Sequence, residues 1–235
     1  MGSFRFKEFT IEQEHSPMKV GTDGVLLGAW VPLRKEDRRL LDMGTGTGVI
    51  ALMLAQRQVD ARITALDIDP SCVREARENA DCSLWGDRVE VVEAAAQDFW
   101  SSEPFDLIVS NPPFFENSLT SPDQGRTLAR HTASLSFEEL LGAVDRLLAP
   151  EGRFAVVLPV EEAQRFRRLA TTHLWLEQWL DVRTTPRRPV KRSLMLFSRR
   201  QPAESPRGEE LVIQTAPEEF TPEYRALTRY FYLKF

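Results

Sequence analysis

The sequence contains no run of eighteen apolar residues and no basic leader followed by an apolar stretch, so we expect neither a membrane span nor a secretory signal. Internal repeats and long low-complexity segments are also missing. Cysteine is scarce: Cys72 and Cys82 lie ten residues apart on one expected helix. We therefore expect ordinary thiols in a reducing cytoplasm rather than a disulfide framework.

A surplus of positive charge is missing as well, because the formal net charge is −5. This balance argues against a nucleic-acid partner unless the basic residues cluster. They do cluster in residues 183–192, where Arg187, Arg188, Lys191 and Arg192 occur without any acid. A loop of this density repels itself unless an anion is nearby, so it is either a solvated loop or a phosphate-binding patch.

The 235 residues are 42% hydrophobic and 28% charged, which suits one α/β domain with appendages. An apolar strand over residues 40–43 leads into a glycine-rich turn with Gly44, Thr45 and Gly46, followed by a helix over 49–56. Alternate glycines let the backbone approach a ligand closely. Asp42 at the strand end disfavours a pyrophosphate and suits a ligand that carries an ammonium group, such as S-adenosylmethionine.

The turn does not fit the dinucleotide-binding pattern, since valine stands where its third glycine is required, and it has no phosphate-binding lysine. A second strand over residues 61–66 ends at Asp67, which is placed to accept both ribose hydroxyls of a nucleoside. Asp67 could instead cap the next helix, because Asp69 and Pro70 follow. We assign the adjacent Ile68 to the same cofactor site. A third strand is expected over residues 88–92.

The motif Asn111-Pro112-Pro113-Phe114 follows a buried strand over residues 105–109. Two prolines end that strand, so Asn111 stands at its carboxyl end, where open α/β sheets bind ligands. The Asn111 amide oxygen and the Pro112 carbonyl are two acceptors, and the Phe114 ring offers a flat apolar face. Together they can hold a planar group that bears an NH2, which indicates methyl transfer to an amino group, with adenine as the favoured target.

Residues 116–134 are expected to form a long loop, and such loops are usually functional or disordered. The loop contains Arg126 and Arg130, and it is either a solvated lid or a clamp that orders over the substrate. His131 also lies here, but methylation of an amine needs no nucleophile, so we assign it no catalytic role.

Alternating apolar residues predict a short strand or hairpin over residues 4–11. A helix is expected to start near Gly24 with Thr22 or Asp23 as its cap. It either packs on the core or, with the segment from Lys19 to Asp23, forms a wall beside the cofactor.

Near the end of the chain we expect a pair of strands over residues 174–184 and 193–199 and a surface loop over 201–210. A short strand is expected over 211–214. The aromatic residues in 230–235 are too numerous for a loose tail and predict docking onto the domain.

Taken together, residues 42–48, Asp67 and residues 111–114 resemble the class I S-adenosylmethionine-dependent methyltransferases. More narrowly, residues 18–30, the basic segment 183–192 and the ending Phe-Tyr-Leu-Lys-Phe resemble the bacterial family that N6-methylates adenine beside the anticodon of valine tRNA. The resemblance covers nearly the whole chain.

This resemblance implies a Rossmann-like α/β fold with a seven-stranded, mostly parallel sheet, helices on both faces and an antiparallel last strand. An N-terminal hairpin and capping helix (residues 1–30) would pack on a methyltransferase domain (residues 31–235). The implied cofactor is S-adenosylmethionine and the implied partner is tRNA, with no metal, no membrane and a monomeric, cytoplasmic protein.

The expected catalytic group is Asn111, Pro112 and Phe114, and the expected cofactor site also uses Asn111. The remaining cofactor residues are Lys19, Thr22, Asp42, Gly44, Thr45, Gly46, Asp67, Ile68 and Ala95, and the expected RNA contacts are Arg126, Arg130, Arg187, Arg188, Lys191 and Arg192.

One position departs from the family pattern. Such enzymes often carry an acid just after the third strand, against the adenine of the cofactor, and this chain has Ala95 there. Asp98 or backbone groups could take its place.

Three alternatives to an RNA adenine methyltransferase stay open. A side-chain amide also presents an NH2, so the same motif could serve a protein glutamine methyltransferase acting on a release factor. A small-molecule N-methyltransferase and a non-catalytic nucleotide- or RNA-binding module are the others.

Overall fold

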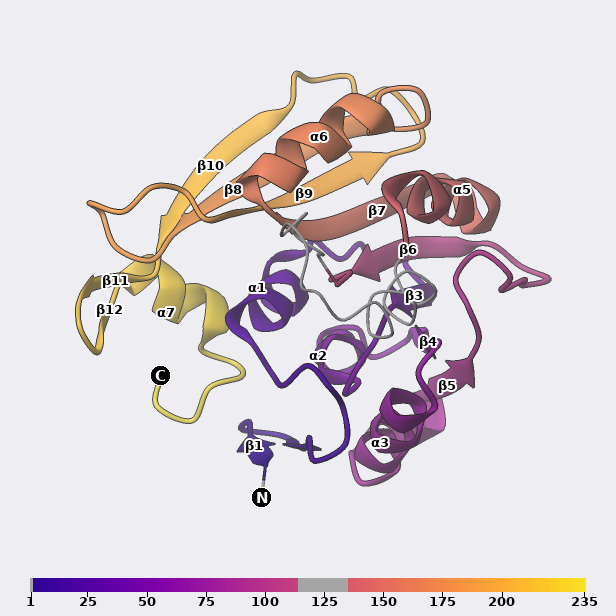
Figure 1. Cartoon of the computed structure of the whole chain (residues 1–235), viewed down its shortest axis with the longest axis horizontal. Coiled ribbons are helices and arrows are strands. Elements are labelled where there is room, and N and C mark those ends of the chain that lie inside the picture. The colour runs from indigo at the N-terminus through magenta and orange to yellow at the C-terminus, as the bar shows by residue number, and fades with distance from the viewer. Residues whose placement is uncertain (1, 114–134) are drawn as a thin grey trace, which may run out of the picture.

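A computed structural model describes residues 2–113 and 135–235 of the chain. Its centre is an eight-stranded sheet in the order β10-β8-β9-β7-β6-β3-β4-β5 (Figure 1). The strands of this sheet, in chain order, are β3 (Arg39–Met43), β4 (Arg62–Asp67), β5 (Val89–Glu93), β6 (Phe105–Ser110), β7 (Leu148–Pro159), β8 (Trp175–Arg183), β9 (Arg192–Ser198) and β10 (Arg207–Val212). Only β9 runs antiparallel to its neighbours, β7 and β8, and every other adjacent pair is parallel.

The expected α/β fold is confirmed, and β9, the seventh strand of the sheet, is antiparallel as expected of the seventh strand. The expected count of seven strands is one too low, and the last strand, β10, is parallel to its neighbour. The eighth strand, β10, lies where we expected a surface loop to reach residue 210 and a strand to begin at 211. It pairs in parallel with the outer strand β8, with Gly208 opposite Trp179. A Cβ on Gly208 would lie 2.2 Å from Cζ2 of Trp179, so the glycine lets the indole lie across the edge strand. Its mostly exposed, charged residues give no apolar alternation from which a strand could be predicted.

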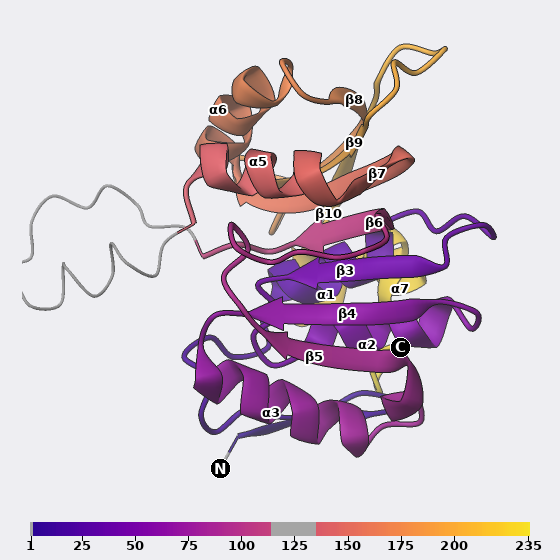
Figure 2. The same ribbon diagram turned by 90° about the vertical axis from the view of Figure 1, so that its right-hand side faces the viewer.

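Helices cover both faces of the sheet. Those of the described residues are α1 (Thr22–Trp30), α2 (Val49–Arg57), α3 (Pro70–Asp81), α5 (Phe137–Leu147), α6 (Val160–Ala170) and α7 (Pro222–Thr228), with a 3-10 turn, η1 (Gly86–Arg88), before β5. One apolar core joins α1, α2, α3 and α7 to one face, and a second joins α5 and α6 to the other. Figure 2 shows α5 in front of the sheet and α1, α2 and α7 behind it. The strands β3, β4 and β6 end at the same edge, which we call the carboxyl edge.

The expected N-terminal hairpin is confirmed as β1 (Ser3–Arg5) and β2 (Thr10–Glu12), with Phe4 opposite Ile11. The helix after it begins at Thr22, two residues before the expected start, and Gly21 is its N-cap without a side-chain cap among the described residues. The expected capping role of Thr22 or Asp23 is therefore wrong. The Asp23 carboxylate instead forms an ion pair with Arg192, far along the chain. We propose that residues 1–30 form a separate unit, which packs on a methyltransferase domain of residues 31–235.

The aromatic end of the chain docks onto the molecule, as expected. Phe231 is buried, and the Tyr232 ring packs against Phe4 and Phe6 of the hairpin. The Lys7 ammonium donates to the carbonyl oxygens of Arg229 and Phe235, each at 2.6 Å. A small sheet of β11 (Gln214–Ala216) and β12 (Glu219–Phe220) precedes α7. Among the described residues, no helix is long and apolar enough to cross a membrane.

Candidate active site

The glycine turn between β3 and α2 has a backbone that requires glycine. Gly44, Gly46 and Gly48 have φ angles of 77°, 57° and 83°, in the left-handed region. The N–H groups of Gly44 and Thr45 both donate to the Leu66 carbonyl at the end of β4, at 2.8 and 2.9 Å. A Cβ on Gly44 or Gly46 would meet no described atom within 4 Å. The turn is therefore fixed from behind and open in front, as a close approach to a ligand requires.

Asp42 lies beneath this turn and is fully buried. Its Oδ2 accepts hydrogen bonds from Thr45 Oγ1 at 2.6 Å and from the Ala51 N–H at 3.1 Å, so one carboxylate fastens the turn to α2. Its Oδ1 has no partner among the residues described. Burial raises the pKa of Asp42 to about 7, which the two hydrogen bonds oppose. An unpaired buried carboxylate oxygen suits a nearby cation, such as the ammonium group expected of the cofactor.

Asp67, at the end of β4, also braces the turn. Its Oδ2 accepts from the Gly46 N–H at 2.8 Å and its Oδ1 from the Asp69 N–H at 3.0 Å. The cap of α3 is Asp69, which accepts from the Ser71 N–H at 2.8 Å. A carboxylate has about four acceptor positions, so Asp67 keeps room for a further donor. Burial raises the pKa of Asp67, so hydroxyl donors that stabilise the carboxylate would be favoured there.

The third strand ends beside the second, where the Ala94 N–H donates to the Asp67 carbonyl at 3.0 Å. The Ala95 carbonyl then accepts from the N–H groups of Asp98 and Phe99, so residues 95–99 form a tight turn. Asp98 is exposed. Ile68, the residue after Asp67, is 47% exposed. An exposed apolar side chain at this edge suits one face of an aromatic base.

Asn111 follows β6, whose end is tied to β3 by a 2.8 Å hydrogen bond from Ser110 Oγ to the Met43 carbonyl. The Asn111 Oδ1 is buried and has no hydrogen-bond partner among the described residues. On the other side of the amide, a Cβ on Gly24 of α1 would lie 3.8 Å from Nδ2. Pro112 is buried. Phe114, Arg126, Arg130 and His131 lie outside the described residues.

The segment before α1 is held against α3, close to the glycine turn. The Lys19 ammonium closes this segment by donating to the carbonyl oxygens of Gln13, Glu14 and Ser16, the last at 3.1 Å. Thr22, which we expect in the cofactor site, is the first residue of α1.

Two buried side chains of α3 that we did not single out from the sequence anchor this segment. Glu75 accepts from the backbone N–H groups of His15 and Ser16, at 2.8 and 2.9 Å. Asn79 Oδ1 accepts from the Glu12 N–H at 2.8 Å, and its Nδ2 donates to the carbonyls of Glu12 and Thr47, each at 2.9 Å. Asn79 thus joins β2 to the glycine turn. Their four-residue spacing on the apolar face of an otherwise amphipathic helix was the available signal.

The basic segment 183–192 joins β8 to β9 and lies at the carboxyl edge, because Arg192 pairs with Pro159 at the end of β7. Two of its cations are neutralised: Arg183 lies 2.8 Å from Glu210, and Arg192 pairs with Asp23. Burial lowers the pKa of Arg192. The anions that such a loop needs are therefore partly supplied by the protein itself.

The other three cations of this segment, Arg187, Arg188 and Lys191, are exposed, and none forms an ion pair with another residue in the described ranges. Asp23 belongs to α1, where a Cβ on Gly24 would lie 3.8 Å from Asn111 Nδ2, so the basic segment and Asn111 lie near the same helix end at one edge. Within the described residues, no group of three His, Cys, Asp or Glu side chains could hold a metal ion.

The chain matches the family model described as methyltransferase small domain over residues 20–169. It is 46% identical to the tRNA1(Val) (adenine(37)-N6)-methyltransferase of Bacteroides thetaiotaomicron, over 98% of this chain and 97% of the relative. The same-named protein of Trichodesmium erythraeum is 45% identical, over 99% of this chain and 98% of its own length.

Among solved structures, a predicted O-methyltransferase from Agrobacterium tumefaciens is similar with a TM-score of 0.68 and 18% identity, over 88% of this chain and 96% of the other. The P. horikoshii TYW2 in complex with MeSAdo is similar with a TM-score of 0.59 and 14% identity, over 83% and 70% of the two chains. At these identities the likeness shows the fold alone.

Proposed function

Because the chain belongs to the family of tRNA1(Val) (adenine(37)-N6)-methyltransferases, we propose that it transfers a methyl group from S-adenosylmethionine to the N6 amino group of an adenine in tRNA. The adenine of the anticodon loop of valine tRNA is the target that the names of its relatives favour. The reaction belongs in the cytoplasm, where tRNA is used.

The observation that carries this proposal is the Asn111 amide. Its Oδ1 is buried without a partner in the described part of the chain, at the carboxyl end of a central strand. A buried acceptor left unsatisfied costs stability of about 1–3 kcal/mol, so such an atom at the end of a central strand favours a ligand that donates to it. The exocyclic amino group of adenine carries two such hydrogens.

We assign the cofactor to the open space in front of the glycine turn, beside the end of β4. The open space before Gly44 and Gly46 admits the amino-acid portion, and the unpaired Oδ1 of Asp42 suits its ammonium. The spare acceptor positions of Asp67 suit the two ribose hydroxyls, and Ile68 and Ala95 lie where the adenine ring would rest. We assign Lys19 and Thr22 to the same site, because Asn79 joins their segment to the glycine turn.

When bound, S-adenosylmethionine supplies a methyl group on a positively charged sulfur. The lone pair of the adenine amino nitrogen is delocalised into the ring, which makes that nitrogen a poor nucleophile. Asn111 Oδ1 and the Pro112 carbonyl accept hydrogen bonds from its two N–H groups and favour a more tetrahedral nitrogen that points its lone pair at the methyl carbon. As the nitrogen–carbon bond forms, the carbon–sulfur bond breaks, and the nitrogen then loses one proton to solvent. Orientation and hydrogen bonding by these groups, with Phe114 stacked on the base, provide the rate enhancement.

The target base must leave its stack to reach Asn111, which costs least in a single-stranded loop. We assign the exposed cations Arg187, Arg188 and Lys191 to the phosphates that flank the base. Arg192 is held by Asp23 of α1, and we assign it to the same RNA contact. Arg126 and Arg130 are proposed as further RNA contacts.

The test uses labelled S-adenosylmethionine with the purified protein and, in parallel, valine tRNA or a peptide-chain release factor. We expect label in tRNA, recovered as N6-methyladenosine after digestion. Label in a glutamine of the release factor, with none in tRNA, would establish the protein methyltransferase instead. If the protein binds no cofactor in a titration, the non-catalytic alternative holds.

A further inference from the structure

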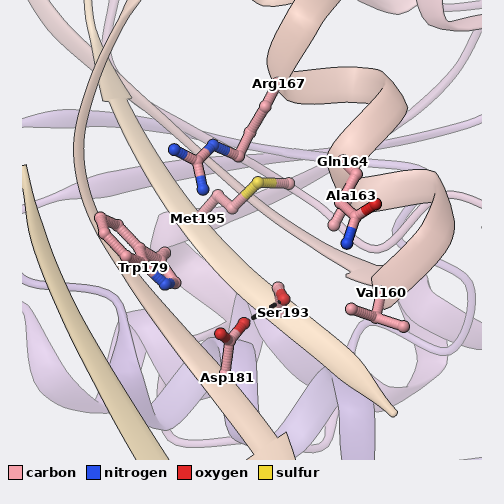
Figure 3. Close-up of a pocket in the computed structure, with 8 residues that line it drawn as sticks. All are labelled: Val160, Ala163, Gln164, Arg167, Trp179, Asp181, Ser193 and Met195. Atoms are coloured by element: carbon pink, nitrogen blue, oxygen red, sulfur yellow. Dashed lines mark hydrogen bonds between the residues drawn. The ribbon is translucent and has the colours of Figure 1, made fainter. Parts of the chain in front are cut away.

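A small cleft lies between α6 and the strands β8 and β9, on the sheet face opposite α1 (Figure 3). Its volume is about 90 Å³, and none of the residues that line it belongs to the site described above. Its lining consists of Val160, Ala163, Gln164, Arg167, Trp179, Asp181, Ser193 and Met195. Four of these are polar, and Figure 3 shows them arranged around the opening.

The cleft adjoins the basic segment. Ser193 directly follows Arg192, and the N–H of Val160 donates to the Lys191 carbonyl at 3.2 Å. Asp181 stands opposite Ser193 in the pairing of β8 with β9, and the Ser193 hydroxyl donates to Asp181 Oδ1. An RNA that contacts Lys191 and Arg192 therefore passes the mouth of this cleft.

The polar groups of the cleft are incompletely paired. Asp181 forms one hydrogen bond, which leaves its second oxygen for a donor. Gln164 has no hydrogen-bond partner among the residues described, and the Arg167 guanidinium lies over the Trp179 ring at 4.9 Å without a carboxylate from the described residues. Polar groups that converge beside an aromatic surface and lack hydrogen-bond partners in the protein are typical of a ligand site.

The charges of the cleft select the class of ligand. Asp181 would repel a phosphate, and Arg167 would repel an ammonium group. A neutral, flat group with donors and acceptors on one edge satisfies both, and its ring can stack on the Arg167–Trp179 pair. Nucleobases with an amino group beside an acceptor, as in cytosine or adenine, have this edge, and carboxylates accept from the cytosine amino group in known readout.

We propose that this cleft is a second base-binding site, which takes an unpaired amino-bearing base of the same RNA whose target adenine reaches Asn111. Asp181 accepts from the amino group, and Gln164 donates to the neighbouring ring acceptor. The proposal rests on the proposed function, because its ligand is a base of the methylated RNA. Its narrow volume fits the edge of a base rather than a whole nucleotide.

The deciding experiment compares Asp181→Asn with Glu161→Gln in the full-length protein, with a valine tRNA transcript as substrate. Each change removes one negative charge near the basic segment, and Glu161 is exposed on α6 without lining the cleft. If the charge acted only through long-range repulsion, both changes would lower the KM for RNA. Base binding predicts the opposite for Asp181→Asn, an increase of about tenfold, equal to about 1.4 kcal/mol.

Asn can still accept the hydrogen bond from Ser193, so the fold should be kept, and the KM for S-adenosylmethionine and the melting temperature check this. If that variant does not fold, Gln164→Ala decides the matter, because Gln164 is exposed on the rim of the cleft. It should raise the KM for RNA several-fold. An unchanged or lower KM for RNA in the folded variant overturns the proposal.

A set of transcripts identifies the base. Each unpaired cytosine or adenine of the anticodon loop other than the target is replaced by uracil, one at a time. The replacement that harms the wild type should have no added effect in Asp181→Asn, since both remove the same contact. Fully additive effects at every position would contradict the base contact. If the wild type methylates no tRNA at all, the proposed function fails instead.

Discussion

The two halves of the carboxyl edge differ in how their polar groups are paired. At the ends of β3 and β4, protein donors that hold the glycine turn engage Asp42 Oδ2 and both carboxylate oxygens of Asp67, whereas Asp42 Oδ1 lacks a partner among the described residues. At the ends of β6, β7 and β8 and the start of β9, the Asn111 Oδ1 is unpaired, and Arg187, Arg188 and Lys191 extend into solvent without ion pairs in the described part of the chain.

This difference indicates two kinds of site. The first half is preorganised, so it can bind a cofactor without reordering its own groups. The second half gains its missing partners from the substrate. Mutations in the first half should therefore change stability and cofactor affinity, whereas mutations in the second should change rate and RNA affinity with the fold intact.

The largest effect should come from Asn111→Ala, because it removes an acceptor that contacts the reacting nitrogen. We expect a fall in kcat of about 100-fold or more. Cofactor affinity, measured by calorimetry, should change little, and Pro113→Ala, at an exposed neighbouring position, serves as the control. A variant that keeps normal turnover would remove Asn111 from the mechanism.

The next effect concerns RNA affinity. Changing Arg187, Arg188 and Lys191 together to Ala should weaken tRNA binding and reduce the slope of log affinity against log salt by about 0.7–0.9 per lost phosphate contact. The control replaces Lys35 and Arg62, two exposed cations near the opposite edge. Equal slopes for the triple variant and the wild type would identify the segment as an ordinary solvated loop.

Asn79→Asp tests the link between the N-terminal segment and the glycine turn. Aspartate can accept from the Glu12 N–H but cannot donate to the carbonyls of Glu12 and Thr47. Because each lost hydrogen bond is worth about 1 kcal/mol, the KM for S-adenosylmethionine should rise on the order of tenfold with kcat kept.

A purely structural role for Asn79 would lower the melting temperature and leave that KM unchanged. Asn79→Gln, which keeps the amide group, should restore part of the affinity. Failure of any variant at this position to alter the KM would separate the N-terminal segment from the cofactor site.

Two glycines with free space for a Cβ provide a matched pair. Gly46 has a left-handed backbone in the first half of the edge, whereas Gly142 lies within α5. Gly46→Ala should destabilise the protein by about 1–2 kcal/mol through backbone strain and weaken cofactor binding. Gly142→Ala should instead stabilise it by up to about 1 kcal/mol. Thermal unfolding measures both, and equal effects would contradict the assignment of the open turn.

The smallest effect is a pH dependence. Since burial raises the pKa of Asp42 to about 7, its carboxyl is half protonated near neutrality. A pKa above the unfolded value stabilises the fold at low pH, and this contribution is lost as the pH rises through about 7. Attraction of an ammonium group needs the ionised carboxylate, so the pH dependence of cofactor affinity is opposite to that of folding stability. Cofactor affinity should thus rise between about pH 6 and about pH 8, and Asp42→Asn should flatten the profile.

Much of this architecture could be predicted from local sequence, because apolar runs, glycines and prolines determine the conformation of the residues next to them. The glycine turn after β3 and the end of β6 at Asn111 lie where the sequence places them. The start of α1 was missed because Asp23 is engaged by Arg192, 169 residues later, rather than by its own helix. No local pattern contains such a partner.

Other features depend on contacts between distant segments. The edge strand β10 is specified by its fit to Trp179 rather than by its own apolar pattern. Asn79 and Glu75 are recognisable as polar residues on an apolar helix face, but their partners in β2 and the following loop follow only from the fold. The roles proposed for the predicted site residues stay predictions that the variants above test.

The most direct test of the central claim is the nucleoside composition of valine tRNA from a strain that lacks this protein, measured by mass spectrometry. The account predicts that one N6-methyladenosine disappears and returns when the wild type is supplied, but not when Asn111→Ala is supplied. Unchanged N6-methyladenosine in the deletion strain, or its full return with Asn111→Ala, would contradict the account.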